Sequence, residues 1–273
     1  MIRLFLVGSP RSGTTLLQTI LATQLQLYTL KETHFFRNLH RWRPVRLLDR
    51  LRLDPARVEA AFGFITGNNR LEGNYDISKV ATLAQACSLF DTLLSTEATL
   101  RGQSGWLEKT PEHMFFMDEI RAHVPGARFV HILRDGPDVV ASLYDAFSKY
   151  PDHWGWLGDI DRMVSLYNRY ARVTAANRSR DDTFVVRYDD LVTGRAATLD
   201  RLAVFVGLEP GSLTLDQVSS WRGDIVRPDE AWKVRSENKV VDTRGTKFKS
   251  LFDDSVRARI LTRLTDTADI PSG

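Results

Sequence analysis

The chain begins with the run Ile2-Arg3-Leu4-Phe5-Leu6-Val7, followed by the turn Gly8-Ser9-Pro10-Arg11-Ser12-Gly13 and then by Thr14-Thr15-Leu16-Leu17. An apolar run, a turn rich in glycine and hydroxyl groups, and a helix-compatible sequence predict a buried strand, a tight loop and a helix N-terminus. Helix N-termini carry unpaired N–H groups and partial positive charge, and glycines let a bulky anion approach the backbone. The stretch therefore predicts a phosphate-binding loop.

The spacing of Gly8 and Gly13 matches the G-x-x-x-x-G of nucleotide-binding P-loops, but Thr14 stands where that motif has its lysine. The cation of this loop is instead Arg11. Two glycines at this spacing alone would indicate an ordinary strand–turn–helix, whereas the added arginine and hydroxyl groups favour anion binding. The predicted contacts are Pro10, Arg11, Ser12, Gly13, Thr14 and Thr15.

The composition is that of a folded globular protein, with 43% hydrophobic and 26% charged residues, which argues against disordered and fibrous classes. The 273 residues suffice for a substantial core, and we expect a single domain over residues 1–273. A net charge of +3 is too small to favour nucleic acid, and no nucleic-acid-binding motif is present.

The cysteine content and the hydropathy pattern bear on the cellular location. Cys87 is the only cysteine, so an internal disulfide framework is excluded and a reducing compartment is favoured. No stretch approaches about 18 apolar residues, so we expect no transmembrane segment. Residues 4–7 are too short for the apolar part of a signal peptide. We expect a cytoplasmic protein, and the sequence leaves a homo-oligomer open.

Strand-like and helix-like patterns alternate along the chain. Strands are expected at residues 25–30, 105–108, 128–133 and 183–188, and helices at 14–24, from 55, 78–99, 112–122, from 139, 157–178, 196–206 and 253–264. This alternation predicts an α/β fold with a mainly parallel central sheet flanked by helices. Residues 37–105 are expected to form a helical insertion suited to a second substrate, and residues 221–250 a lid loop.

A second segment suited to phosphate is Phe129-Val130-His131-Ile132-Leu133-Arg134-Asp135-Gly136-Pro137-Asp138-Val139-Val140-Ala141-Ser142. Arg134 stands at the expected end of a strand, and Ser142 follows about two helical turns later. The arginine can form bidentate bonds to a phosphate, and the serine hydroxyl can add another. A surface ion pair between Arg134 and Asp135, with Ser142 uninvolved, is the alternative interpretation.

These blocks resemble the sulfotransferases that use 3′-phosphoadenosine 5′-phosphosulfate (PAPS). The resemblance covers most of the chain and implies a P-loop NTPase-like sulfotransferase fold. It implies that residues 8–17 form the 5′-phosphosulfate loop, with Arg11 where many members have a catalytic lysine. It also implies that Arg134 and Ser142 hold the 3′-phosphate.

Two later segments extend the resemblance. Val186-Arg187-Tyr188-Asp189-Asp190-Leu191 is similar to another recurrent stretch of the family, so Tyr188 is a predicted nucleotide contact. Arg244, Gly245 and Lys247 resemble the adenosine-side segment, and we expect them to contact the nucleotide as well.

Lys31-Glu32-Thr33-His34-Phe35-Phe36 and Glu108-Lys109-Thr110-Pro111 resemble paired motifs of the heparan-sulfate and other carbohydrate sulfotransferases. In that branch the matching glutamate is the catalytic base, and the matching lysine lies in the active site. The resemblance therefore implies that Glu32, Lys109 and Arg11 are catalytic. From the residues alone, His34 and His113 are alternative bases.

The implied reaction moves a sulfuryl group from PAPS to a hydroxyl, or as second choice an amine, of a carbohydrate or other small metabolite. Its other product is adenosine 3′,5′-bisphosphate (PAP). No metal is required, and no metal-binding motif is present. The alternatives are a P-loop kinase or related NTPase, which Thr14 argues against, and a catalytically silent nucleotide-binding protein, which Glu32 and Lys109 argue against.

Overall fold

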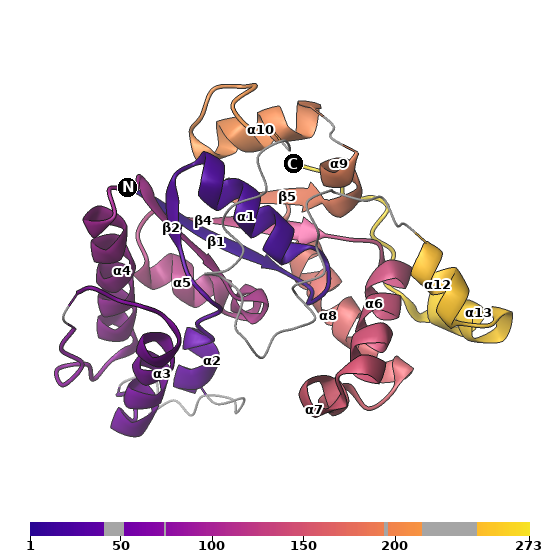
Figure 1. Ribbon diagram of the computed structural model, residues 1–273, viewed down its shortest axis with the longest axis horizontal. Helices are drawn as coiled ribbons and strands as arrows, with labels where there is room; N and C mark the ends of the chain where they lie inside the picture. Colours follow the sequence, from indigo (N-terminus) through magenta and orange to yellow (C-terminus); the bar gives the residue numbers. More distant parts are fainter. Residues whose placement is uncertain (41–51, 74, 194–195, 215–244) are drawn as a thin grey trace.

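The computed structural model describes residues 1–40, 52–73, 75–193, 196–214 and 245–273. In this part of the chain one five-stranded sheet has the strand order β2-β3-β1-β4-β5, and every neighbouring pair is parallel. The strands are β1 (Ile2–Gly8), β2 (Leu27–Thr29), β3 (Gly105–Lys109), β4 (Ala127–Leu133) and β5 (Thr183–Arg187). The predicted α/β fold with a parallel central sheet flanked by helices is confirmed (Figure 1).

Helices connect and cover these strands. In chain order, with η marking a 3₁₀ helix, they are α1 (Thr14–Gln24), α2 (Phe35–His40), α3 (Pro55–Asn68), α4 (Leu83–Leu100), η2 (Pro111–Phe116), α5 (Met117–His123), α6 (Gly136–Lys149), α7 (Pro151–Trp154), η3 (Gly155–Leu157), α8 (Ile160–Asn177), α9 (Tyr188–Val192), α10 (Ala196–Val206), α12 (Thr246–Leu251) and α13 (Asp254–Arg263).

The two faces of the sheet follow from the alternation of side chains along β1. Leu4 and Leu6 lie in a buried cluster with apolar residues of α1 and α10. Phe5 points to the opposite face, where it contacts Trp106 and Phe129 in the cluster that includes α3, α4 and α5. Because successive side chains of a strand point to opposite faces, an unbroken apolar run needs cover on both sides.

The helical insertion expected at residues 37–105 contains α3 and α4, and both contribute to the core on the Phe5 face. A second group of helices, α6, α8, α12 and α13, forms its own apolar cluster. Figure 1 shows these two groups on opposite sides of the sheet in the view, with α3 and α4 at left and α12 and α13 at right.

Some predicted boundaries were wrong. The helix expected from residue 78 begins at Leu83, because Asp76 Oδ1 accepts bonds from the backbone N–H and hydroxyl of Ser78 and holds a turn there. Thr82 then starts α4 through a capping box with Gln85. The helix expected from residue 139 begins three residues earlier, at Gly136, with proline in its first turn.

Three other segments differ from the predicted elements. A 3₁₀ helix, η2, precedes α5 where one helix was expected over 112–122. The short helix α12 lies within the expected lid loop of residues 221–250, of which residues 221–244 fall outside the described residues. Tyr188 begins α9 and does not end β5.

The strand order locates the functional edge. After β1 the chain adds β2 and β3 on one side of β1 and then β4 and β5 on its other side. The order of strand addition therefore changes side between β1 and β4, which are neighbours. In such parallel sheets ligands bind beyond the carboxyl ends of the strands at this switch point. The loop after Gly8 and the residues after Leu133 lie there.

Candidate active site

Two glycines hold the loop of residues 8–13 against the neighbouring elements. A Cβ at Gly8 would lie 2.5 Å from the carbonyl oxygen of Ile132 on β4. Gly13 has a φ of 98°, and a Cβ there would lie 2.6 Å from the Tyr188 ring. Both positions exclude a side chain, so the loop lies directly on β4 and on the start of α9.

The hydroxyl-rich residues of this loop have different roles. Ser12 is fully buried, and its hydroxyl donates to the carbonyl of Ser9 at 2.6 Å, which closes the loop from inside. Gly13 has no side chain with which to cap α1, so Thr14 and Thr15 begin the helix with backbone N–H groups that no cap side chain occupies. Pro10 lies half-buried in the turn. The backbone geometry fits an anion site.

Arg11 connects the first loop to the second phosphate segment. Its Nε donates to Ser142 Oγ at 3.2 Å, although 131 residues separate the two in the sequence. Burial lowers the pKa of Arg11, Asp145 raises it, Arg134 lowers it again and Tyr150 raises it slightly. An arginine remains charged even so. Two guanidinium groups, those of Arg11 and Arg134, are thus gathered at one place.

Arg134 follows β4 directly and lies over the ring of Tyr188, with Cζ 4.3 Å from the ring centroid. Its Nη2 is 3.5 Å from Asp138 Oδ2, at the limit of a hydrogen bond, and its buried Nε has no hydrogen-bond partner among the described residues. The alternative ion pair with Asp135 is not formed, since Asp135 pairs with Arg187 at 2.7 Å. Arg134 retains donors for an anion.

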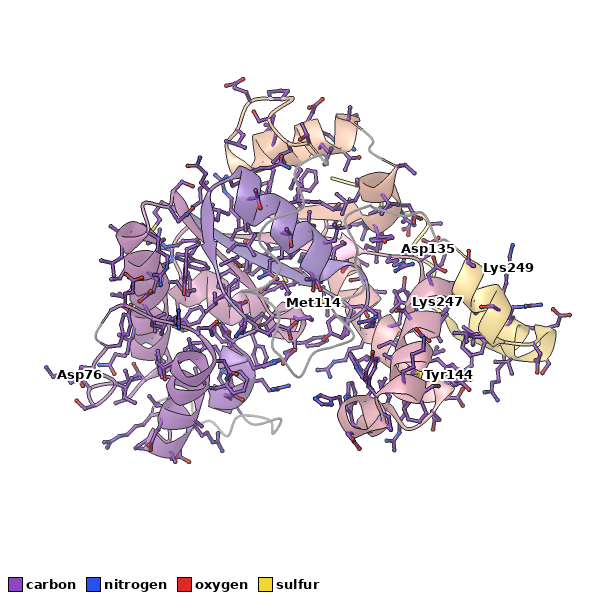
Figure 2. All side chains as sticks on the ribbon, viewed as in Figure 1. Asp76, Met114, Asp135, Tyr144, Lys247 and Lys249 are labelled. Carbon is purple, nitrogen blue, oxygen red and sulfur yellow. The ribbon has the colours of Figure 1, made fainter. Side chains whose placement is uncertain are left out.

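The predicted adenosine-side residues lie against α6, the helix that carries Ser142. The N–H of Gly245 donates to Asp138 Oδ1 at 2.9 Å, and Lys247 Nζ lies 2.6 Å from Asp145 Oδ2. Figure 2 labels Lys247, on α12, and Tyr144, on α6, in the region where these two helices share an apolar cluster. Arg244 lies outside the described residues. Asp138 therefore contacts both Arg134 and the start of α12.

A second group of site residues follows β2 and β3. Lys109, the last residue of β3, is 1% exposed, and its Nζ forms an ion pair and hydrogen bond with Glu32 Oε1. The two residues come from the two motifs that sequence analysis paired. A buried ammonium beside a carboxylate of low exposure places both charges where water screens them little.

Glu108 connects the two segments that carry Glu32 and Lys109. Its Oε1 accepts bonds from the hydroxyls of Thr33 at 2.8 Å and Thr110 at 2.5 Å, which join the loop after β2 to the end of β3. Burial raises the pKa of Glu108, but the charge and hydrogen bond of His113 and the two threonine hydroxyls outweigh it, so the pKa is lowered. The ionised carboxylate thus ties together the segments that carry Glu32 and Lys109.

His34 lies between two carboxylates. Its Nδ1 is 2.5 Å from Glu112 Oε1, and its Nε2 is 3.7 Å from Glu32 Oε2. Arg37 Nη1 also lies 3.0 Å from Glu112 Oε1. Burial raises the pKa of Glu112, but the hydrogen bond and charge of His34 and the charge of Arg37 outweigh it, so that the pKa is lowered.

His113, the other alternative base, belongs to the core. Its ring is fully buried, lies edge-on to Phe36 with centroids 5.1 Å apart, and faces Phe5. Its Nδ1 is 2.7 Å from Glu108 Oε2. This environment gives His113 a supporting role beneath the site and no access to a bound substrate.

Sequence analysis did not assign roles to Glu108, Glu112 or Asp138, which contact the predicted site residues. Glu108 and Glu112 flank the Lys-Thr-Pro motif, and Asp138 is one helical turn after Arg134. The signal that could have found these residues in the sequence was a carboxylate close to a cation of a recognised motif. Among the described residues, no group of three or more His, Cys, Asp and Glu side chains is placed to hold a metal ion, and no helix is long and apolar enough to cross a membrane.

Solved structures share this fold at low sequence identity. The sulfotransferase domain of the curacin biosynthetic pathway is 15% identical over 96% of each chain, with a TM-score of 0.61. The sulfotransferase domain of the Synechococcus PCC 7002 olefin synthase is 17% identical over 98% of this chain and 96% of its own, with a TM-score of 0.58. Retinol dehydratase in complex with androsterone and the inactive cofactor PAP is 13% identical over 98% of this chain and 83% of its own, with a TM-score of 0.51.

A search of curated proteins gives no match. The model of the sulfotransferase family matches residues 3–211, which run from β1 to beyond α10 and include both groups of site residues except those of α12. The matched region contains the predicted phosphate loop, the strand-end arginine and the glutamate–lysine pair. Because this family model covers most of the sequence, the chain belongs to the sulfotransferase family.

Proposed function

We propose that this sulfotransferase uses PAPS and transfers its sulfuryl group to a hydroxyl of a carbohydrate or other small metabolite, releasing PAP. An amine is the second choice of acceptor. The observation that carries the proposal is the meeting of the Arg11 loop with Ser142 and Arg134. Two guanidinium groups that converge at one place suit a ligand that carries several negative charges.

The nucleotide would occupy this first group of residues. The loop of residues 8–13 and the first turn of α1 suit the 5′-phosphosulfate, while Arg134 and Ser142 suit the 3′-phosphate. Tyr188 already stacks on Arg134 and offers a ring at the same place. The structure of retinol dehydratase with PAP supports a nucleotide of this kind in the shared fold.

The transfer itself would take place at the second group. Glu32 accepts the proton of the acceptor hydroxyl, the acceptor oxygen forms a bond to sulfur, and the bond from sulfur to the 5′-phosphate oxygen breaks with its electron pair on that oxygen. Lys109 and Arg11 stabilise the negative charge that grows on the departing bisphosphate. These residues therefore divide the work between proton removal and charge stabilisation.

Direct binding of PAP tests the proposal. We expect calorimetry to show binding of PAP that is at least about tenfold weaker for Arg134→Ala, because a charge-assisted bidentate contact is lost. Arg128→Ala is the matched control, since Arg128 lies on β4, the strand that Arg134 follows, and donates to the carbonyl of Phe205. Absence of PAP binding by the unmodified protein, or stronger stabilisation by magnesium and ATP than by PAP, would overturn the proposal.

Sulfur-labelled PAPS with a panel of alcohols, sugars and amines then identifies the acceptor. The proposal expects label in a product only when Glu32 and Lys109 are intact. Label transferred equally well by Lys109→Met would contradict the assignment of that residue to the reaction.

A further inference from the structure

The contacts of His34 define a chain of three side chains. Glu112, at the start of η2, contacts Nδ1 of the imidazole, and Nε2 on the other side faces Glu32. The first distance, 2.5 Å, is that of a strong hydrogen bond, whereas the second, 3.7 Å, is too long for one. A carboxylate hydrogen-bonded to Nδ1–H leaves Nε2 as an acceptor of protons.

The backbone of His34 is held in an unfavourable conformation. Its φ is 49°, and among the described residues only Arg11 and Gln26 share a positive φ without being glycine. Such strain persists where the surroundings fix it, and it gathers at functional sites. Gln26 has no place in the proposed site, so the backbone of His34 supports a functional role together with the two carboxylate contacts of its ring.

The groups that face His34 come from several elements. Lys109 on β3 holds Glu32, Arg37 on α2 holds Glu112, and the ring of Phe64 on α3 lies edge-on to the imidazole at 5.4 Å. Tyr170 on α8 also lies near, because Glu112 and Glu32 both help to raise its pKa. Each of the two carboxylates thus has a cation beside it.

We propose that Glu112 is a positioning residue that fixes His34 with its proton on Nδ1, so that Nε2 can receive the proton that Glu32 removes from the acceptor. This inference rests on the proposed function and extends it. The proton first moves from the acceptor oxygen to Glu32 as the sulfur–oxygen bonds exchange. When the 3.7 Å gap between Glu32 Oε2 and His34 Nε2 closes to hydrogen-bond distance in the substrate complex, the proton moves from Glu32 to Nε2. This step restores the Glu32 carboxylate and leaves an imidazolium beside Glu112.

Nitrogen NMR of the full chain, labelled with ¹⁵N-histidine and free of ligand, tests the arrangement without an acceptor. At pH 9 an ordinary imidazole is neutral, and the ¹⁵N signals show which ring nitrogen carries the proton. The variant His34→Gln identifies the His34 signals. We expect the proton on Nδ1 in the unmodified protein, and a shift of it toward Nε2 in Glu112→Met, which has no acceptor.

Two further variants separate positioning from general packing. Glu112→Gln keeps a carbonyl that can accept from Nδ1–H, so it should preserve the unmodified pattern of His34. Glu119→Met removes the carboxylate that lies 2.7 Å from Nε2 of His40 on the neighbouring helix and should leave the His34 signals unchanged.

The inference is overturned if His34 carries its proton on Nε2 in the unmodified protein, if it is doubly protonated at pH 9, or if Glu112→Met leaves its pattern unchanged. The spectrum of the unmodified protein decides the question alone should Glu112→Met fail to fold. Failure of PAP to bind would reject the proposed function by a separate measurement and would not alter the NMR result.

Discussion

Lys109 has two opposite effects on the proposed reaction of Glu32. A nearby ammonium favours the ionised form of a carboxylate and thereby makes it a weaker base. The same ammonium can stabilise a leaving bisphosphate, and any shift of Lys109 toward that charge would strengthen Glu32 as a base. Under the proposed function, arrival of the nucleotide and activation of the base are coupled through one side chain.

Glu32→Gln should separate proton removal from nucleotide binding. We expect kcat with the identified acceptor to fall by about 100-fold or more, because the amide cannot accept the proton. Binding of PAP by calorimetry should not become weaker, since the residues assigned to PAP are intact and Lys109 loses a competing carboxylate. Glu72→Gln, at an exposed ion pair with Arg101, is the matched control and should retain full activity. Full activity of Glu32→Gln would transfer the role of base to His34.

At the scale of the element, β4 carries a fully buried histidine that packs against α8. His131 is fully buried, and its Nδ1 lies 3.3 Å from the hydroxyl of Thr174 on α8. Burial, together with the charge of Arg121 and partly opposed by Asp182, lowers the pKa of His131 to about 3. The folded protein therefore holds this imidazole neutral where an unfolded chain would protonate it.

This histidine should make the protein sensitive to mild acid. The pKa of His131 in the folded protein lies below the unfolded value of about 6.5. The contribution of neutral His131 to the free energy of unfolding is therefore complete above pH 6.5 and is lost as the pH falls from 6.5 toward 3. Between pH 7.5 and 5 we expect the free energy of unfolding to fall by about 2 kcal/mol more for the unmodified protein than for His131→Leu. Denaturant unfolding at both pH values measures it. Equal losses in both proteins would contradict the prediction, and His153→Gln, at an exposed position, should behave like the unmodified protein.

Most of the strands were readable in the sequence because the sheet is buried on both faces. Apolar runs gave β1 and β4 to within a residue, and the glycine-rich turn gave the start of α1. The predicted starts of α4 and α6, at residues 78 and 139, were wrong. Thr82 and not Ser78 caps α4, and Pro137 lies in the first turn of α6 and not before the helix. Short helices such as α9 carry too few residues for a periodic pattern.

At the scale of the whole molecule, the segment of residues 267–273 contacts the end of β5. Arg187, at the end of β5, donates to the carbonyls of Thr267 at 2.8 Å and Ile270 at 3.1 Å. The N–H of Gly273 donates to the carbonyl of Val185 at 2.9 Å. Because Arg187 also pairs with Asp135, this segment supports the turn that follows Arg134.

Ile270→Ala tests how much this segment contributes to stability. Ile270 is 1% exposed and lies in a cluster with Leu133 and Val185. Removing its side chain should lower the free energy of unfolding by about 3 kcal/mol, through lost burial and the cavity that remains. Chemical denaturation gives the value, and Leu261→Ala, at a position 53% exposed, should change it by less than about 0.5 kcal/mol. A similar effect of both substitutions would contradict this view of the segment.

The site was only partly predictable from the sequence. Motif spacing placed Arg11 after one strand, Arg134 at the end of another and Ser142 in the helix that follows Arg134. The structure brings them together because β1 and β4 are neighbours. The contacts of Glu112 with His34 depend on how η2 turns after β3, which no local pattern encodes. Long-range carboxylate contacts of this kind require the fold itself.

The left-handed backbone at Arg11 and His34 has a consequence for the history and the engineering of this chain. A non-glycine residue in that conformation costs on the order of 1 kcal/mol or more, which glycine or asparagine would largely relieve. A search for the most stable sequence on this backbone would therefore replace both residues first. Selection for thermostability alone would replace Arg11 and His34, to which we assign anion binding and proton transfer. Stabilising substitutions are therefore better made in other parts of the chain.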